Sequence, residues 1–197
     1  MTIRPVVIAP DERLNTKSSP VEVIDDSIRT LAADMLDTMY HERGIGLAAV
    51  QVGELKRMLV ADVEWRDDGA KGTNVGTQYV LINPEIIEED PEPHVYKEGC
   101  LSFPEQFAEV TRPLKVKVKY QNLEGEWKEE LFDGLLATCI QHEIDHINGI
   151  NFVDHISRLK KGMIIKRLTK MKKQGYFNDD CGHDHAEGET CGGGEKL

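Results

Sequence analysis

The chain has 197 residues, of which 40% are hydrophobic and 30% charged, and its net charge is −11. This length and composition are typical of one soluble globular domain, and no repeat or apolar stretch of membrane-spanning length interrupts the sequence. The acidic balance argues against nucleic-acid binding as the main activity, and the first residues resemble no signal or transit peptide. We therefore expect a protein that enters no membrane and binds no specific DNA site.

The N-terminal third predicts one helix and one strand. Residues 27–43 have apolar side chains at helical spacing, with capping candidates at 25–27 and Gly44 at the end. The small-residue stretch 44–51 is predicted to be a loop, and residues 56–63 are predicted to include a strand. The apolar helix face consists of Ile28, Leu31, Met35, Leu36 and Met39.

The middle of the chain predicts strands. Residues 66–78 contain three glycines and two aspartates, so they are expected to form a mobile hairpin or loop. A strand at 79–83 is predicted to stop at Pro84, and the segment around Cys100 is predicted to be a short extended piece or tight turn. Alternating residues at 114–120, a turn at 122–125 and a partner strand at 127–132 predict a hairpin.

Two helices are predicted after this hairpin: an apolar one at 134–148, which Gly149 ends, and a basic one at 157–173. The expected fold is α+β, with antiparallel or mixed sheets packed around the central helix and with further helices near both ends. Residues 1–175 are expected to form a single domain.

Residues 176–197 form a polar tail that is expected to be disordered. The alternative is an adventitious or storage metal site, because the tail contains two cysteines and two histidines. The four cysteines of the chain are interpreted as metal-binding and core residues plus this tail pair, and not as a disulfide framework. They are Cys100, Cys139, Cys181 and Cys191.

The central helix carries the sequence His-Glu-x-x-His. Residues four apart lie on one helix face, so His142 and His146 can bind one cation. Glu143 lies beside them, close enough to reach a bound water without being a ligand. Two histidines and two acids are costly to bury in an apolar helix without partners. The motif therefore predicts a hydrolytic metal site.

The third ligand is expected upstream of the motif. Phe152 occupies the position of the third histidine in metzincin peptidases, and no glutamate follows Glu143 before the tail. The candidates are Cys100 and Cys139. Ligands at 139, 142 and 146 would span about 10 Å of helix axis, too far for one ion with bonds of about 2.0–2.3 Å, so Cys100 is favoured.

Three blocks of sequence together resemble the peptide deformylase family. They are Gly-x-Gly-Leu-Ala-Ala-x-Gln at 44–51, Glu-Gly-Cys-Leu-Ser at 98–102 and Gln-His-Glu-x-x-His at 141–146. The resemblance covers roughly residues 5–175. It implies an enzyme of the bacterial cytoplasm that hydrolyses the formyl group from N-formylmethionyl peptides during protein synthesis.

The resemblance also implies roles for individual residues. One divalent ion would be held by Cys100, His142 and His146; the family typically uses Fe(II), and zinc, nickel or cobalt may substitute. Glu143 would move the proton, and Gly46 would bind the substrate main chain. Gln51 and the backbone N–H of Leu101 would stabilise the oxyanion. The pocket for the first side chain would consist of Ile45, Tyr96, Glu98, Leu135, Thr138 and Cys139, with core packing as the alternative role.

Several alternatives remain at this stage. Glu98 could instead pair with Arg112 and support the metal site without touching substrate. Phe107 occupies a position at which many bacterial relatives of the family have a basic residue. A zinc peptidase or a non-catalytic metal carrier would share parts of the site. The resemblance also implies that the basic helix at 157–173 contacts the ribosome, and its eight basic residues without an acid suit an RNA-rich surface. Alternatively, the helix only packs Leu159, Met163 and Leu168 on the core.

Overall fold

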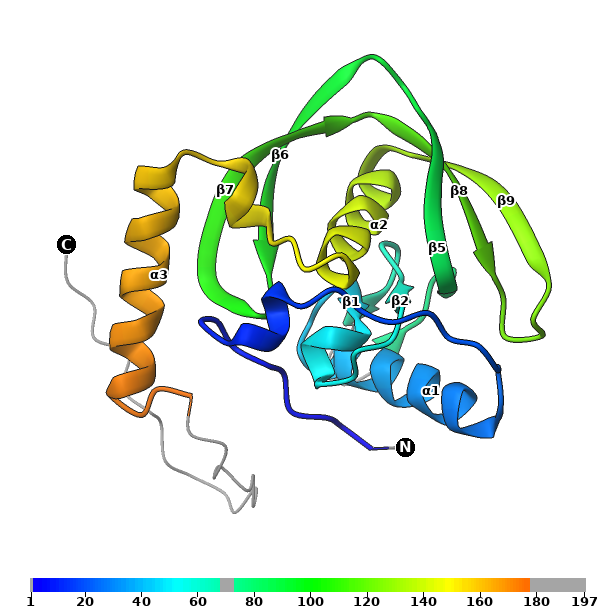
Figure 1. The fold of residues 1–197 in the computed structure, drawn as a ribbon, viewed down its shortest axis with the longest axis horizontal. Helices are drawn as coiled ribbons and strands as arrows, with labels where there is room; N and C mark the ends of the chain where they lie inside the picture. The colour runs from blue at the N-terminus through cyan, green and yellow to red at the C-terminus, as the bar shows by residue number, and fades with distance from the viewer. Residues whose placement is uncertain (1, 68–72, 178–197) are drawn as a thin grey trace.

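The computed structural model describes residues 2–67 and 73–177 (Figure 1). The helices are α1 (Asp26–His41), α2 (Gly134–Ile147) and α3 (Arg158–Lys173), with 3-10 turns η1 (Glu12–Asn15), η2 (Ala49–Val52) and η4 (Phe152–His155). The strands are β1 (Gly46–Ala48), β2 (Met58–Ala61), β3 (Arg66–Asp67), β4 (Thr73–Asn74), β5 (Tyr79–Glu89), β6 (Pro93–Cys100), β7 (Phe103–Pro113), β8 (Lys115–Gln121) and β9 (Trp127–Asp133).

The strands form sheets that enclose α2. One sheet has the order β1-β2-β5-β8-β9, β6 pairs with β7, and β3 pairs with β4. Every pairing between these strands is antiparallel. In Figure 1, α2 lies between the β6–β7 hairpin and the larger sheet, and it contacts β1, β2, β7, β8 and β9. The expected α+β fold is therefore confirmed.

Apolar residues from α1, α2 and the sheets build the core. α1 begins at Asp25, whose carboxylate accepts hydrogen bonds from Ser27 N and Ile28 N. Its buried face packs on β1 and β2, while α2 packs on the inner face of β8 and β9. No helix within the described ranges combines the length and the apolar content that a membrane crossing needs.

The predicted hairpin and three helices are confirmed within a few residues. β8 alternates buried and half-buried residues as expected, and it pairs with β9 across the turn at Gly125, where φ is +83°. Gly149, at φ +77°, follows the end of α2. The predicted mobile loop at 66–78 contains the short β3–β4 pair, and residues 68–72 lie outside the described ranges. The tail prediction also falls outside them from residue 178 onward.

Two local predictions are wrong. The stretch 44–51 is a strand followed by a 3-10 turn, because it pairs with β2. β5 continues past Pro84 to Glu89. The β5–β8 ladder shifts register between Ile82 and Glu85, so it needs no backbone N–H at Pro84. The segment around Cys100 is extended and then turns tightly, as predicted: β6 ends at Cys100, and residues 101–102 form the turn into β7. The full length of this eight-residue strand and its hairpin was not predicted.

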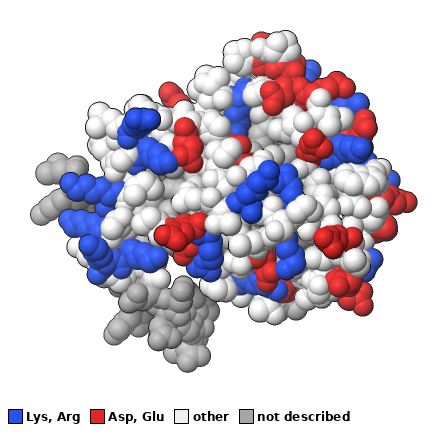
Figure 2. All heavy atoms as spheres, in the orientation of Figure 1, with Lys and Arg blue, Asp and Glu red and all other residues white. Residues whose placement is uncertain are grey.

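The basic helix α3 is correctly placed, but its apolar residues do not all face the core. Leu168 is buried, whereas Leu159 and Met163 are 76% and 65% exposed. The alternative in which all three merely pack inward is therefore wrong. Figure 2 shows the basic side chains gathered over α3, at the left of the view.

Candidate functional site

The metal-binding candidates converge beneath the β6–β7 hairpin. His142 and His146 lie one turn apart on α2, with ring centroids 4.9 Å apart. Cys100 ends β6, and its Sγ lies 3.1 Å from His146 Nε2. One donor atom from each residue falls within 4.8 Å of the others, and this is the one such trio found in the described part of the chain. The structure thus brings together all three predicted ligands, and Cys139 is not among them.

The donor set fits a divalent transition-metal ion. An ion with bonds of about 2.0–2.3 Å needs donor atoms roughly 3–4 Å apart. Burial and the neighbouring His142 hold the pKa of His146 well below its usual value, so this ring is a neutral donor. Burial would lower the pKa of His142, but hydrogen bonds to Cys100 and Glu98 raise it well above its usual value. A cation that binds there therefore displaces a proton.

Two groups fix the ring of His142. Its Nδ1 lies 2.8 Å from Glu98 Oε2, and its ring stacks on Phe152 with 6.1 Å between centroids and a 25° interplanar angle. The contact with Glu98 leaves Nε2 to face the metal position, which is the usual support for a metal-binding histidine. Phe152 occupies the metzincin third-ligand position and here supplies a packing surface.

Glu98 belongs to a buried ion-pair chain. Arg112 Nε donates to Glu98 Oε1 at 2.6 Å, and its NH1 donates to Asp145 Oδ2 at 2.8 Å. Asp145 Oδ2 also lies 2.7 Å from His155 Nε2. Burial would raise the pKa of Glu98, but His142 and Arg112 lower it to about 2. Although Glu98 borders the cavity, these contacts favour the supporting role over contact with a substrate side chain.

Glu143 is the buried carboxylate that faces the cavity without a full set of partners. Its Oε2 makes no hydrogen bond within the described residues, and burial raises its pKa to about 7. A Cβ added at Gly46 would lie 2.7 Å from Glu143 Oε1 and 2.5 Å from Cys139 Sγ. The backbone of β1 thus passes so close to α2 that glycine is required at position 46.

The free edge of β1 runs along the cavity. Asp62 N donates to Ile45 O at 2.9 Å, so these two residues form a hydrogen-bonded pair of the antiparallel ladder. Such pairs alternate, which makes Gly46 and Ala61 a non-hydrogen-bonded pair. The peptide N–H and C=O of Gly46 therefore point away from β2, and β1 is the last strand of its sheet among the described residues.

The side-chain amide of Gln51 lies beside Cys100, one of the three candidate ligands. Its Oε1 accepts from Ala48 N at 2.7 Å, and this contact fixes the orientation of the amide. Its Nε2 faces Cys100 Sγ at 3.4 Å and Ser102 Oγ at 3.2 Å. Leu101, whose N–H is the second predicted oxyanion donor, borders the same cavity. Both residues predicted to supply oxyanion donors therefore border the cavity that Cys100 also lines.

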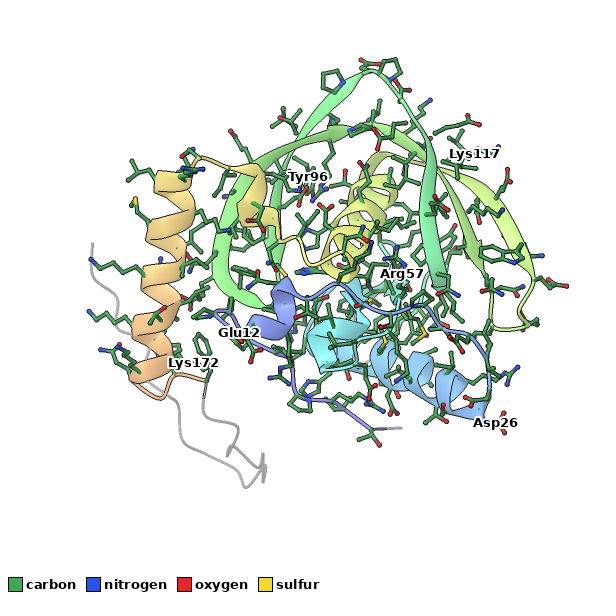
Figure 3. All side chains as sticks on the ribbon, viewed as in Figure 1. Glu12, Asp26, Arg57, Tyr96, Lys117 and Lys172 are labelled. Carbon is green, nitrogen blue, oxygen red and sulfur yellow. The ribbon has the colours of Figure 1, made fainter. Side chains whose placement is uncertain are left out.

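A cavity of about 540 Å³ opens over these groups, a size suited to a small-molecule or peptide ligand. Phe107 stands at its mouth, 60% exposed, with Lys97 Nζ 5.5 Å above its ring. Tyr96, labelled in Figure 3, lies on β6 near α2. All the predicted pocket residues line the cavity: Ile45, Tyr96, Glu98, Leu135, Thr138 and Cys139.

Four supporting residues were missed from the sequence, namely Ser102, Asp145, Phe152 and His155. Asp145 carried a signal, because a second acid in an apolar helix requires a cationic partner, and Arg112 is that partner. No pattern in the sequence pointed to Phe152 or His155, because their contacts depend on how η4 folds back on α2 and β7.

Comparisons with known proteins agree with this geometry. Residues 3–162 match the family model described as polypeptide deformylase. The peptide deformylase of Rhizorhabdus wittichii is 51% identical over 173 residues, which cover 88% of this chain and 97% of the relative. The crystal structure of peptide deformylase from Ehrlichia chaffeensis is 40% identical, covers 89% of this chain and 99% of its own, and superposes with a TM-score of 0.80.

A second structure of the Ehrlichia chaffeensis enzyme, in complex with actinonin, has 38% identity and a TM-score of 0.80, covering 88% of this chain and 99% of its own. The matches cover the whole metal site and the cavity around it. The chain belongs to the polypeptide deformylase family.

Proposed function

We propose that the Cys100–His142–His146 site carries the activity of this family, which is the hydrolysis of the N-formyl group from the formylmethionine of new polypeptides with release of formate. The observation that supports this site most is the convergence of its three donors over one cavity with Glu143, a buried carboxylate whose Oε2 has no partner among the described residues. A peptidase is not favoured, because the third donor is a cysteine at the end of β6 and not a downstream histidine or glutamate. A mere metal carrier would need neither Glu143 nor the oriented amide of Gln51.

One divalent ion is the cofactor that these donors suit. When bound, it supplies Lewis acidity that polarises a carbonyl and makes water more acidic. The proposal includes ferrous iron as the physiological ion, as the family resemblance implies. The Cys-His-His donor set would also accept zinc, nickel or cobalt.

Protein groups bind the substrate main chain, transfer the proton and stabilise the oxyanion. Gly46 pairs its outward N–H and C=O with the main chain of an extended substrate, as a strand edge does. Glu143 takes the proton from the attacking water and returns it to the leaving amine. Gln51 Nε2 and the N–H of Leu101 donate to the developing oxyanion, and each such donor is worth roughly 3 kcal/mol of barrier.

The inner cavity selects the first side chain. Ile45, Leu135 and Cys139 are apolar, and burial raises the pKa of Cys139 so that its thiol stays neutral. An unbranched methionine side chain can fill such a space without leaving a polar group unpaired. A charged side chain would lose its hydration there without gaining a partner.

Substrate selectivity tests this assignment. Formyl-Met-Ala-Ser should release formate, while formyl-Glu-Ala-Ser should have a kcat/KM lower by roughly 100-fold or more. Unformylated Met-Ala-Ser serves as the control and should remain uncleaved. Cleavage of its peptide bonds without formate release from the formylated peptide would instead indicate the peptidase.

The proposed catalytic unit is residues 1–175, acting in the bacterial cytoplasm, where formylated chains are made. The family match at 3–162 and the contact of α3 with the core through Leu168 support including α3 in this unit. Phe177 packs against the same cluster, two residues past the proposed boundary. Residues 176–197 are proposed to be a separate tail.

The basic helix α3 is the proposed contact with the ribosome. Its eight basic residues leave a net charge of −19 on the rest of the chain, against −11 overall, so the attraction to an RNA-rich surface is local and salt-dependent. Exposed Leu159 and Met163 add apolar contact area on the same helix.

Reversing Lys170, Lys172 and Lys173 to Glu should therefore weaken co-sedimentation with ribosomes and spare turnover of free peptides. Reversing Lys117, Lys119 and Lys128 on β8 and β9 gives the matched control with the same change in net charge. Figure 3 shows Lys172 and Lys117 on opposite sides of the molecule. Equal losses of ribosome co-sedimentation in both variants would reflect net charge alone. Unchanged co-sedimentation of the α3 variant would exclude α3 as the ribosome contact.

A further inference from the structure

The backbone beside Gly46 is held by groups that lie outside the metal site. Gly44 O accepts a hydrogen bond from Trp65 Nε1 at 2.7 Å. Ile45 O accepts from Asp62 N at 2.9 Å and from Cys139 Sγ at 3.4 Å. Gly44 and Ile45 both border the cavity. Hydrogen bonds from three residues outside β1 thus fix the two carbonyls that precede Gly46.

The indole of Trp65 is itself held in place. Trp65 is 8% exposed, and its ring packs edge-on against Tyr40, with centroids 5.5 Å apart and planes at 68°. An indole N–H can only donate, and Gly44 O is its acceptor. The aromatic packing therefore sets the position from which Trp65 reaches Gly44.

Asp62 locks the turn that carries Trp65. Its fully buried carboxylate accepts from Trp65 N and Glu64 N at Oδ1, both at 3.0 Å. At Oδ2 it accepts from Tyr40 OH and Gly76 N, both at 2.9 Å. A buried carboxylate with four donors is well satisfied, so this turn is a rigid support.

We propose that Asp62 and Trp65 are positioning residues, which act through the carbonyls of Gly44 and Ile45 to aim the free edge of β1 at the substrate main chain. This inference rests on the proposed function of Gly46. β1 has only three residues and one neighbouring strand, so the bond of Asp62 that extends its ladder and the side-chain bond of Trp65 matter for the rigidity of the edge. Gly44 comes directly after Arg43, which has φ +58°, and a hydrogen bond at Gly44 O restrains the chain where it leaves that turn.

Trp65→Phe is the variant that tests the proposal. It removes the donor to Gly44 O and keeps an aromatic ring against Tyr40. For formyl-Met-Ala-Ser we expect KM to rise roughly fivefold, the effect of one lost hydrogen bond, with kcat within twofold and metal content unchanged. Formylmethionine, which has no downstream peptide groups to pair with Gly46, should show little difference between wild type and variant.

Trp127→Phe is the matched control. Trp127 is the second of two tryptophans in the chain, lies on β9 and is 55% exposed, so the same substitution there should leave both kinetic constants unchanged. In the Trp127→Phe protein, Trp65 becomes the sole tryptophan, and its emission should shift when the product peptide Met-Ala-Ser binds. Tyr40→Phe, which removes the hydroxyl bond to Asp62, should shift KM in the same direction by a smaller factor and serves if Trp65→Phe is unstable.

The outcomes separate this inference from the proposed function. Absence of formate release from wild-type protein would defeat the function itself. An active wild type with unchanged KM in both Trp65→Phe and Tyr40→Phe would overturn the positioning role. An equal loss on formyl-Met-Ala-Ser and on formylmethionine would overturn it too, since that pattern reflects general damage to the fold.

Discussion

Replacing Glu143 with Ala is expected to lower kcat for deformylation by about two to four orders of magnitude while the protein keeps its metal ion. Glu143 faces the cavity with Oε2 unpaired among the described residues, and burial raises its pKa to about 7. A carboxyl group whose pKa lies near neutrality can take up and return a proton at physiological pH. It is not one of the three converging donors, so its loss should not empty the site.

Metal analysis and steady-state kinetics on the same preparation check this expectation. Glu143→Gln should lose a similar factor, because the amide keeps the shape of the side chain but cannot accept the proton. Glu124→Ala makes the same type of substitution at an exposed turn residue and should leave kcat unchanged. A folded Glu143→Ala protein without metal would make Glu143 a ligand, and normal kcat would remove it from the reaction.

The second large effect is expected at Cys100. Cys100→Ala should weaken metal binding by more than about 100-fold, beyond the loss typical for a group that only supports a ligand. The thiolate is one of three donors, and its Sγ lies 3.1 Å from His146 Nε2. With two imidazoles left, the site lacks both a ligand and the negative charge that attracts the cation. Formate release should fall with the bound metal.

Cys139→Ala is the matched control for the metal measurement. Cys139 is the second free cysteine of the described chain, and its Sγ donates to Ile45 O, so the metal content should remain near one ion per chain. His142→Ala and His146→Ala should resemble Cys100→Ala. Stoichiometric metal in Cys100→Ala, or a site emptied only by Cys139→Ala, would reverse the choice between the two cysteines.

The sequence alone was sufficient to predict those features that follow from short-range rules. Histidines four apart share one face of a helix because the helix turn is fixed, so His142 and His146 could be paired before any fold was known. The alternation of β8 and the turn to β9 follow from one buried face and one exposed face. The start of α1 follows from the Asp25 cap, and the end of α2 follows from Gly149.

Local patterns failed where pairing with a distant strand overrides them. β1 looks like a loop because its small residues have no alternation, and it becomes a strand through β2. β6 was missed because only Glu98 among its eight residues is buried, so no hydrophobic period marks it. Pro84 does not end β5 because the register shift there removes the need for its missing N–H.

At the site, the sequence determined the chemistry of the donors, and the tertiary structure decided which of them meet. Family blocks named Cys100, but its distance from His146 depends on where β6 ends against α2, forty-six residues away in the chain. The same holds for Arg112 between Glu98 and Asp145 and for Trp65 on Gly44. These contacts join segments that are far apart in the sequence, and sequence separation does not determine the distance between two residues in space. Only the packing of the hairpin, helix and sheet around one core brings them together.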